Sequence, residues 1–170
     1  FLDNGAGFTF NSNITASSGN LTFSDDTTFV KKTTFATAGT ITVDTEKTIT
    51  AQKDFEVTNG TVDLKGSITT TDVALKLNTV QVSNKASLSA KKITITGSIE
   101  PKTAADSSLW NLSLTTTGSS DDDTISVGSD TGAEISIGTA DKLFKDITLT
   151  TTNQNITFGE TCKLHAAGTI

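Results

Sequence analysis

Short aliphatic side chains alternate with hydroxyl side chains along most of this sequence. In residues 40–43 (TITV) the aliphatic and hydroxyl groups must lie on opposite faces of an extended chain, because successive side chains of a β-strand alternate. No window shows the i, i+3, i+4, i+7 apolar spacing that a helix of about ten or more residues requires. The sequence therefore predicts an all-β protein. The alternation recurs at residues 48–50, 55–57, 61–64, 79–82, 93–96, 112–114, 125–127, 135–137, 147–149 and 156–158.

A repeat of about twenty residues organises these predicted strands. Five similar segments begin at residues 20, 39, 60, 78 and 97, which are 19, 21, 18 and 19 positions apart by subtraction. Each begins with Gly or Asn, residues that readily adopt a left-handed turn. This period predicts a parallel β-solenoid (β-helix) with three short strands per coil. An antiparallel β-sandwich is the alternative, since it also has short alternating strands. Further strands are expected near Ile49, Phe55, Ile68, Leu75 and Leu88.

Composition favours a narrow core and a single structural unit. The 34% hydrophobic content is low for a compact sandwich of 170 residues. We interpret residues 1–170 as one solenoid segment, and as a processed product or a slice of a longer secreted protein, because Phe1 is not Met and no signal segment is visible. Loop excursions are predicted near residues 100–109, where Pro101 cannot donate to a sheet ladder, and near the polar residues 118–124.

The sequence offers little for catalysis or cofactor binding. Solenoid enzymes that cleave acidic polysaccharides combine carboxylates with Arg or Lys, but this chain has no Arg. Cys162 and His165 have the spacing of half a zinc site, and no second pair accompanies them. We therefore predict no enzyme activity, no catalytic residue, no metal and no cofactor. A net charge of −6 disfavours nucleic acid, and the lack of a long apolar run predicts no membrane insertion.

The predicted loops supply the candidate contact residues, because recognition usually occurs on excursions from a rigid scaffold. Trp110 is expected to cover core, with stacking on a sugar as the alternative. The acidic run at 121–123 could supply oxygen ligands to Ca²⁺, but its spacing matches no known calcium loop, so a solvated turn is favoured. The candidate contacts are Glu100, Lys102, Asp106, Trp110, Asp121, Asp122 and Asp123.

Asparagine followed by any residue and then Ser or Thr is a glycan-acceptor motif in secreted proteins. Chance produces several such motifs in a chain this rich in Asn, Ser and Thr, so chance is favoured, with glycosylation as the alternative. The candidate glycan acceptors are Asn13, Asn20, Asn59, Asn111 and Asn155.

Threonine triplets of the form Thr-x-Thr raise a further alternative. Stacked in successive coils, they would form the flat hydroxyl lattice of ice-binding solenoids. The triplets at 40–42, 48–50, 94–96 and 148–150 are not one coil apart. We therefore expect them not to align in one rank, and ice binding is not favoured.

Two stretches carry a family resemblance. Residues 59–70 (NGTVDLKGSITT) and 91–100 (KKITITGSIE) resemble the passenger regions of bacterial autotransporters and of two-partner-secreted exoproteins of the filamentous haemagglutinin type. The resemblance extends over most of the chain in composition and period, without a signature motif. It implies a right-handed parallel β-helix that is extracellular, on or near a bacterial cell surface.

The resemblance further implies a non-enzymatic adhesin, or an adhesin-stalk module, that attaches to host or neighbouring cells through a protein or glycan receptor. The alternative is a self-assembling structural subunit of an extracellular fibre or sheath, whose partners are further copies of itself. The physical reason is that an uncapped solenoid leaves unpaired N–H and C=O groups at its ends.

Overall fold

A computed structural model describes residues 7–103, 110–128, 135–152, 154–159 and 161–170. The described residues form no helix and three sheets, which we call A, B and C. Sheet A contains β1 (Phe8–Phe10), β4 (Thr27–Phe29), β7 (Thr48–Ala51), β10 (Ser67–Thr70), β13 (Ala86–Ala90), β16 (Leu112–Thr116) and β19 (Ile147–Thr150). Sheet B contains β2 (Ile14–Ala16), β5 (Thr33–Phe35), β8 (Phe55–Val57), β11 (Ala74–Leu77), β14 (Lys92–Ile95), β17 (Ile125–Val127) and β20 (Ile156–Phe158). Sheet C contains β3 (Leu21–Phe23), β6 (Thr40–Val43), β9 (Thr61–Leu64), β12 (Thr79–Val82), β15 (Ile99–Pro101), β18 (Ser136–Ile137) and β21 (Lys163–Leu164).

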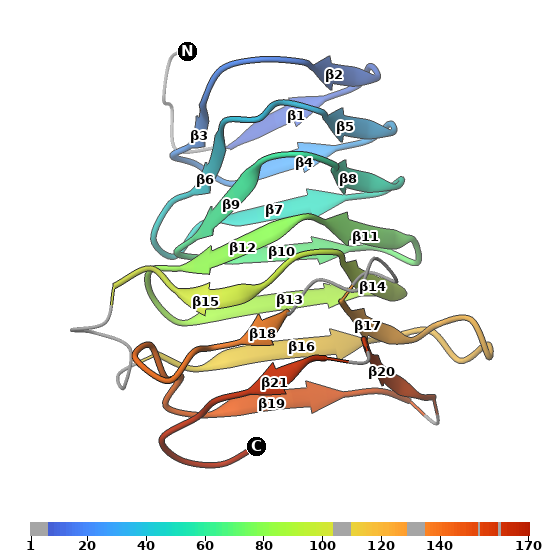
Figure 1. Ribbon diagram of the computed structural model, residues 1–170. Helices are drawn as coiled ribbons and strands as arrows, with labels where there is room; N and C mark the ends of the chain where they lie inside the picture. Colours follow the sequence, from blue (N-terminus) through green and yellow to red (C-terminus); the bar gives the residue numbers. More distant parts are fainter. Residues whose placement is uncertain (1–6, 104–109, 129–134, 153, 160) are drawn as a thin grey trace.

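Three consecutive strands, one from each sheet, make one coil of a parallel β-solenoid. Within each sheet the strands follow one another in chain order, and the pairings between the described strands are parallel. From β1 at the back of Figure 1 the chain passes through β2 on the right to β3 at the front and descends as a right-handed coil. The predicted solenoid is confirmed, and parallel pairing excludes the antiparallel sandwich.

The core is a narrow column of inward side chains that stack from coil to coil. In sheet A, Ile49, Ile68, Leu88 and Leu114 occupy one register position in successive strands, and each is fully buried. Their stacking explains why the coils cohere, since burying each such side chain contributes roughly 1.5–3 kcal/mol. The core therefore consists of the apolar half of every alternating strand.

Phenylalanine fills the first coils of this column. The ring of Phe29 lies between 5.2 and 6.2 Å, centroid to centroid, from four other rings. Phe29 stacks on the first of these rings and meets the others tilted or edge-on, as aromatic pairs prefer. These ring contacts pack the side chains of the first three coils against one another. The four rings belong to Phe10, Phe23, Phe35 and Phe55.

Close backbone approach, and not a left-handed turn, explains the glycines that precede the sheet C strands. A Cβ at Gly60 would collide with the carbonyl oxygen of Gly39, and a Cβ at Gly39 would collide with that of Gly19. Of these three, only Gly19 has a positive φ, of 88°. The expectation that Gly39 and Gly60 adopt left-handed turns is therefore wrong. Glycine is needed there because consecutive coils touch at this corner.

Asparagine at the same corner joins one coil to the next by its side chain. Asn20 Oδ1 accepts a hydrogen bond from the Thr40 N–H at 2.8 Å, and Asn78 Nδ2 donates to the Gly60 carbonyl at 3.2 Å. Neither Asn20 nor Asn78 has a positive φ. The role of these two residues is therefore to form hydrogen bonds between coils, and not to adopt a left-handed turn.

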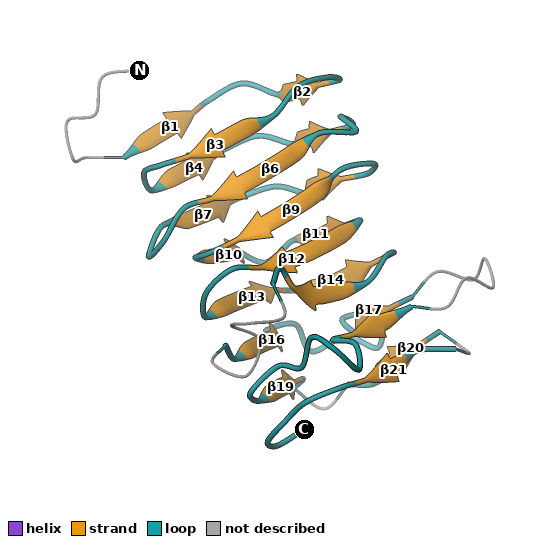
Figure 2. Cartoon of the chain, turned by 60° about the vertical axis from the view of Figure 1, so that its left-hand side comes forward, coloured by secondary structure: helices purple, strands orange, loops and turns teal. Residues whose placement is uncertain are grey.

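Among the strands that the structure describes, connections of eight or more residues occur only after β15. β15 extends to Pro101, so Glu100 and Pro101 lie in a strand and not in the predicted loop, residues 104–109 of that loop lie outside the described residues, and β16 begins at Leu112. Residues 117–124 connect β16 to β17, and residues 138–146 connect β18 to β19. The strands remain stacked across these connections (Figures 1 and 2), and their residue register continues.

Candidate binding surfaces

The outer face of sheet A is a two-dimensional array of hydroxyl groups, which we call the hydroxyl face. Every outward position in the described strands of sheet A is Thr or Ser. One rank contains Thr9, Thr28, Thr50, Thr69, Ser89, Thr115 and Thr150. The second rank contains Thr48, Ser67, Ser87, Ser113 and Thr148.

This face overturns one expectation from the sequence. The triplets 48–50 and 148–150 do share the same two ranks, with hydroxyl triplets of the intervening strands between them. The triplets 40–42 and 94–96 are separate, because they begin on sheet C and sheet B. The sequence spacing does not reveal the alignment, because serine replaces threonine in the intervening strands and because insertions change the spacing between coils.

The hydroxyls of this face form no hydrogen bond with one another. Adjacent parallel strands lie about 4.8 Å apart, whereas an O–H···O bond spans only about 2.5–3.0 Å. Among the described residues, no side-chain oxygen of either rank is seen bonded to another protein group. Each hydroxyl is therefore left to bond with water or with a ligand.

Sheet C instead presents a charged cluster, which we call the Asp63 patch: Asp63, Ser83, Glu100, Lys102 and Lys142. Asp63 is only 3% exposed, and its carboxylate accepts hydrogen bonds from Ser83 Oγ and from Lys102 Nζ, each at 2.5 Å. Lys142 Nζ lies 3.4 Å from Glu100 Oε1. Two predicted contact residues, Glu100 and Lys102, thus meet on one face, together with partners that sequence analysis did not identify.

The other predicted contact residues are not part of this patch. Trp110 is half-buried and packs against the core, which agrees with its predicted covering role. Asp106 lies outside the described residues. Asp121 and Asp122 are exposed in the connection from sheet A to sheet B, the corner opposite sheet C. A contact role for any of them stays a prediction.

Asp123 closes its own turn. It is 4% exposed, and its Oδ2 accepts hydrogen bonds from Ser120 Oγ at 2.6 Å and from the Ser120 N–H at 2.8 Å. The Ser120 hydroxyl is the main reason that the pKa of the Asp123 carboxyl is lowered. The acidic run is therefore organised by local hydrogen bonds around one buried carboxylate.

The candidate glycan acceptors differ in exposure. Asn13, Asn20, Asn59 and Asn155 are exposed, and Asn111 is half-buried with its Oδ1 enclosed and without a hydrogen-bond partner. The Asn20 and Asn59 side chains already bond to neighbouring coils. Asn13 and Asn155 are consequently the acceptors that a glycan could occupy without displacing such a bond.

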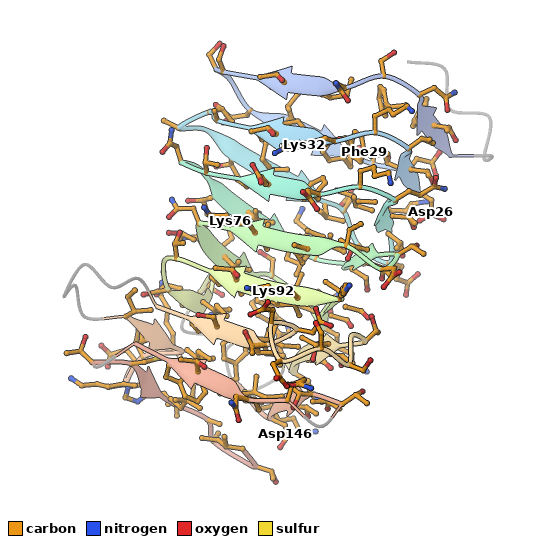
Figure 3. All side chains as sticks on the ribbon, turned by 90° about the vertical axis from the view of Figure 1, so that its right-hand side faces the viewer. Asp26, Phe29, Lys32, Lys76, Lys92 and Asp146 are labelled. Carbon is orange, nitrogen blue, oxygen red and sulfur yellow. The ribbon has the colours of Figure 1, made fainter. Side chains whose placement is uncertain are left out.

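Sheet B carries charges of both signs. Figure 3 shows Lys32, Lys76 and Lys92 following one another down this face. Glu56 and Lys76 are paired neighbours in the ladder, and Lys32 Nζ lies 3.4 Å from Glu56 Oε1. Sheets B and C are thus charged, whereas the outward positions of sheet A are neutral.

The end of the column at β1, β2 and β3 contains an apolar cavity of about 500 Å³. The rings of Phe8, Phe10, Phe23 and Phe29 line it, and Asp25 lies among the lining residues. The apolar inward side chains exposed at this end are of the type that the next coil covers elsewhere in the stack.

Thiol and metal chemistry have little support in the part of the chain that the structure describes. Burial raises the pKa of the Cys162 thiol above its ordinary value. Within the described ranges, no three His, Cys, Asp or Glu side chains are grouped so that they could hold a metal ion. The same residues include no helix that is long and apolar enough to span a membrane.

No protein-family model, curated protein or solved structure matches this chain. Functional inference therefore depends on the surfaces described above.

Proposed function

We propose that this chain is a non-enzymatic extracellular adhesin or adhesin-stalk module, located at a bacterial cell surface and attaching to a protein or glycan receptor on host or neighbouring cells. The observation that carries the proposal is the Asp63 patch. Its residues come from β9, the turn after β12, the end of β15 and the connection 138–146, so the stacked coils hold them in a fixed arrangement.

The chemistry of the patch suits recognition. The side chains of Glu100 and Lys142 are each less than one-third exposed, and that of Lys102 is about half exposed. A charged receptor group could therefore replace one member of an ion pair at a modest desolvation cost. The rigid coils beneath the patch would keep the entropic cost of binding low. The likeness in sequence style to haemagglutinin-type passenger regions supports the same function.

Adhesion of beads coated with the protein to a panel of cells and immobilised glycans tests this proposal. The double variant Glu100→Ala/Lys142→Ala should lose adhesion. The matched control is Lys32→Ala/Glu56→Ala on sheet B, which removes an ion pair of the same 3.4 Å separation and should adhere like the wild type. Equal adhesion by both double variants, or no adhesion by the wild type, would contradict the proposal.

A fibre or sheath subunit is the second candidate, and the apolar end cavity favours it. The inward residues of β19, Ile147 and Leu149, match the alternation of Phe8 and Phe10 in β1. A second copy could continue the column if it displaced the C-terminal residues 167–169, since the Thr169 carbonyl accepts the Ile147 N–H. Such head-to-tail contacts do not close and would yield filaments. Electron micrographs across a concentration series should then show rods that lengthen with concentration. Rods of constant length would exclude this candidate and leave the adhesin proposal intact.

A further inference from the structure

The neutral charge of the hydroxyl face is the starting observation. The outward positions of the sheet A strands include no Asp, Glu or Lys, whereas sheet B carries Glu56 and Lys76 and sheet C carries Asp63 and Glu100. A β-branched hydroxyl residue suits any exposed strand, so propensity alone would spread threonine over all three sheets. The strands of the third face can therefore contact a partner only through neutral hydroxyl groups.

The geometry defines what that partner must look like. Hydroxyls recur about every 4.8 Å from coil to coil and about every 6.7 Å along each strand, at alternate residues. Because no hydroxyl bonds to its neighbour, each one is available to a separate water molecule or ligand oxygen. The bound oxygens must then repeat with the period of the sheet in both directions.

The positions of these hydroxyls are also well fixed. Threonine has restricted χ1 rotamers, and each side chain in the interior coils is flanked by the equivalent side chain of the coils on either side. Thr50 and Thr69 are accordingly half-buried although they point outward. Charged side chains on the other faces have more rotamer freedom and hold hydration shells of their own.

We propose that the hydroxyl face binds ice. A crystal of water is a ligand whose oxygens recur on this scale in two dimensions, and a neutral grid of donor-acceptor hydroxyls can join its surface layer. The waters held by the two ranks supply that first layer, and the threonine methyl groups occupy gaps between them. This inference goes beyond the proposed adhesin function and does not depend on it.

The test is the growth of single ice crystals in a solution of the whole chain, measured by nanolitre osmometry. The wild type should hold crystals without growth over a temperature gap below the melting point and should shape them into facets. Thr69→Lys, in the centre of the face, should lose most of this gap. Thr94→Lys is the matched control, because Thr94 is an outward, half-buried residue in the middle of sheet B, and it should keep the full gap.

A gain-of-function variant protects the test from effects of misfolding. Ser67→Thr, Ser87→Thr, Ser89→Thr and Ser113→Thr together make every position of both ranks threonine and should widen the gap. The proposal is overturned if the wild type neither shapes ice nor delays its growth, or if Thr69→Lys and Thr94→Lys lose the gap equally. Binding to crystalline cellulose or chitin without any effect on ice would also overturn it and assign the face to polysaccharide.

Discussion

Lys102 Nζ lies 2.5 Å from Asp63 Oδ2, although 39 residues separate the two along the chain. Asp63 occupies an outward register position of sheet C, where Thr42 precedes it and Gln81 follows it. The carboxylate is nevertheless buried, because Lys102 and Ser83 cover it. One long side chain at the end of β15 thereby ties together three coils.

Lys102→Met should lower the free energy of unfolding by about 1–3 kcal/mol, because it leaves a buried carboxylate without its charged partner. Lys102 is about half exposed, which places the loss at the lower end of that range. Urea unfolding monitored by circular dichroism measures it. The control Lys32→Met breaks a more exposed ion pair and should cost no more than about 0.5 kcal/mol. Asp63→Thr in the Lys102→Met background should restore stability, and no recovery would contradict this account.

Phe35→Ala should cost roughly 3–5 kcal/mol, since the ring is 1% exposed and its removal leaves a cavity in the column. Phe10→Ala should cost clearly less, because Phe10 is only half-buried at the end of the stack. Thermal and urea unfolding of both variants make the comparison. Equal losses would show that the terminal coil is as tightly packed as the interior.

Gly60→Ala should destabilise the protein by about 1–3 kcal/mol, because the new Cβ overlaps the Gly39 carbonyl oxygen and the coils must separate locally. Gly19 imposes a different constraint, since a Cβ there meets no atom within 4 Å but its φ is 88°. Gly19→Asn should therefore be better tolerated than Gly19→Ala, whereas Gly60→Asn should be no better than Gly60→Ala. If Asn changed the stability equally at both positions, steric contact would not be the reason that residue 60 is glycine.

The turn around Asp123 should weaken in acid. Its pKa in the folded chain lies below the ordinary value of 3.8, so the stabilisation is fully present above about pH 3.8 and is lost as the pH falls through the folded-state pKa. An NMR titration of the Ser120 amide, which donates to this carboxylate, should show a midpoint below 3.8. Ser120→Ala should raise that midpoint, because the Ser120 hydroxyl is the main cause of the lowered pKa. An unchanged midpoint would count against the assigned cause.

Cys162 should react slowly with disulfide reagents near neutral pH. Burial raises its pKa above the ordinary 9.0, so the reactive thiolate is scarce in the folded protein. The rate of labelling should rise when the chain is unfolded in urea, where the pKa returns to its ordinary value. Faster labelling of the folded protein would indicate an activating neighbour, contrary to this structure.

The strands and the core could be predicted from sequence because they depend on neighbouring residues. Alternation at 40–43 already separates the inward Ile41 and Val43 from the outward threonines, and the repeat of about twenty residues determines how such strands stack. The same local reasoning gave the wrong cause for Gly39 and Gly60, because the atoms that crowd them belong to the preceding coil.

The surfaces could not be predicted to the same extent, since they depend on register between coils. The hydroxyl triplets that start at 48, 67, 87, 113 and 148 are 19, 20, 26 and 35 residues apart by subtraction, so insertions conceal a rank that is regular in space. In the Asp63 patch, Lys102 contacts Asp63 and Lys142 contacts Glu100, and local patterns carry no information about such distant pairs.

The corner between sheets C and A receives both of the longest connections, after β15 and after β18, while the strands on either side keep their register. Residues inserted at this corner therefore leave the pairing of the stacked strands unchanged. Moving an inserted peptide from one coil to the next would shift it along the rod by a single strand spacing, about 4.8 Å, without changing its direction. The position of a displayed epitope along the rod can therefore be set in equal steps by the choice of coil that carries it.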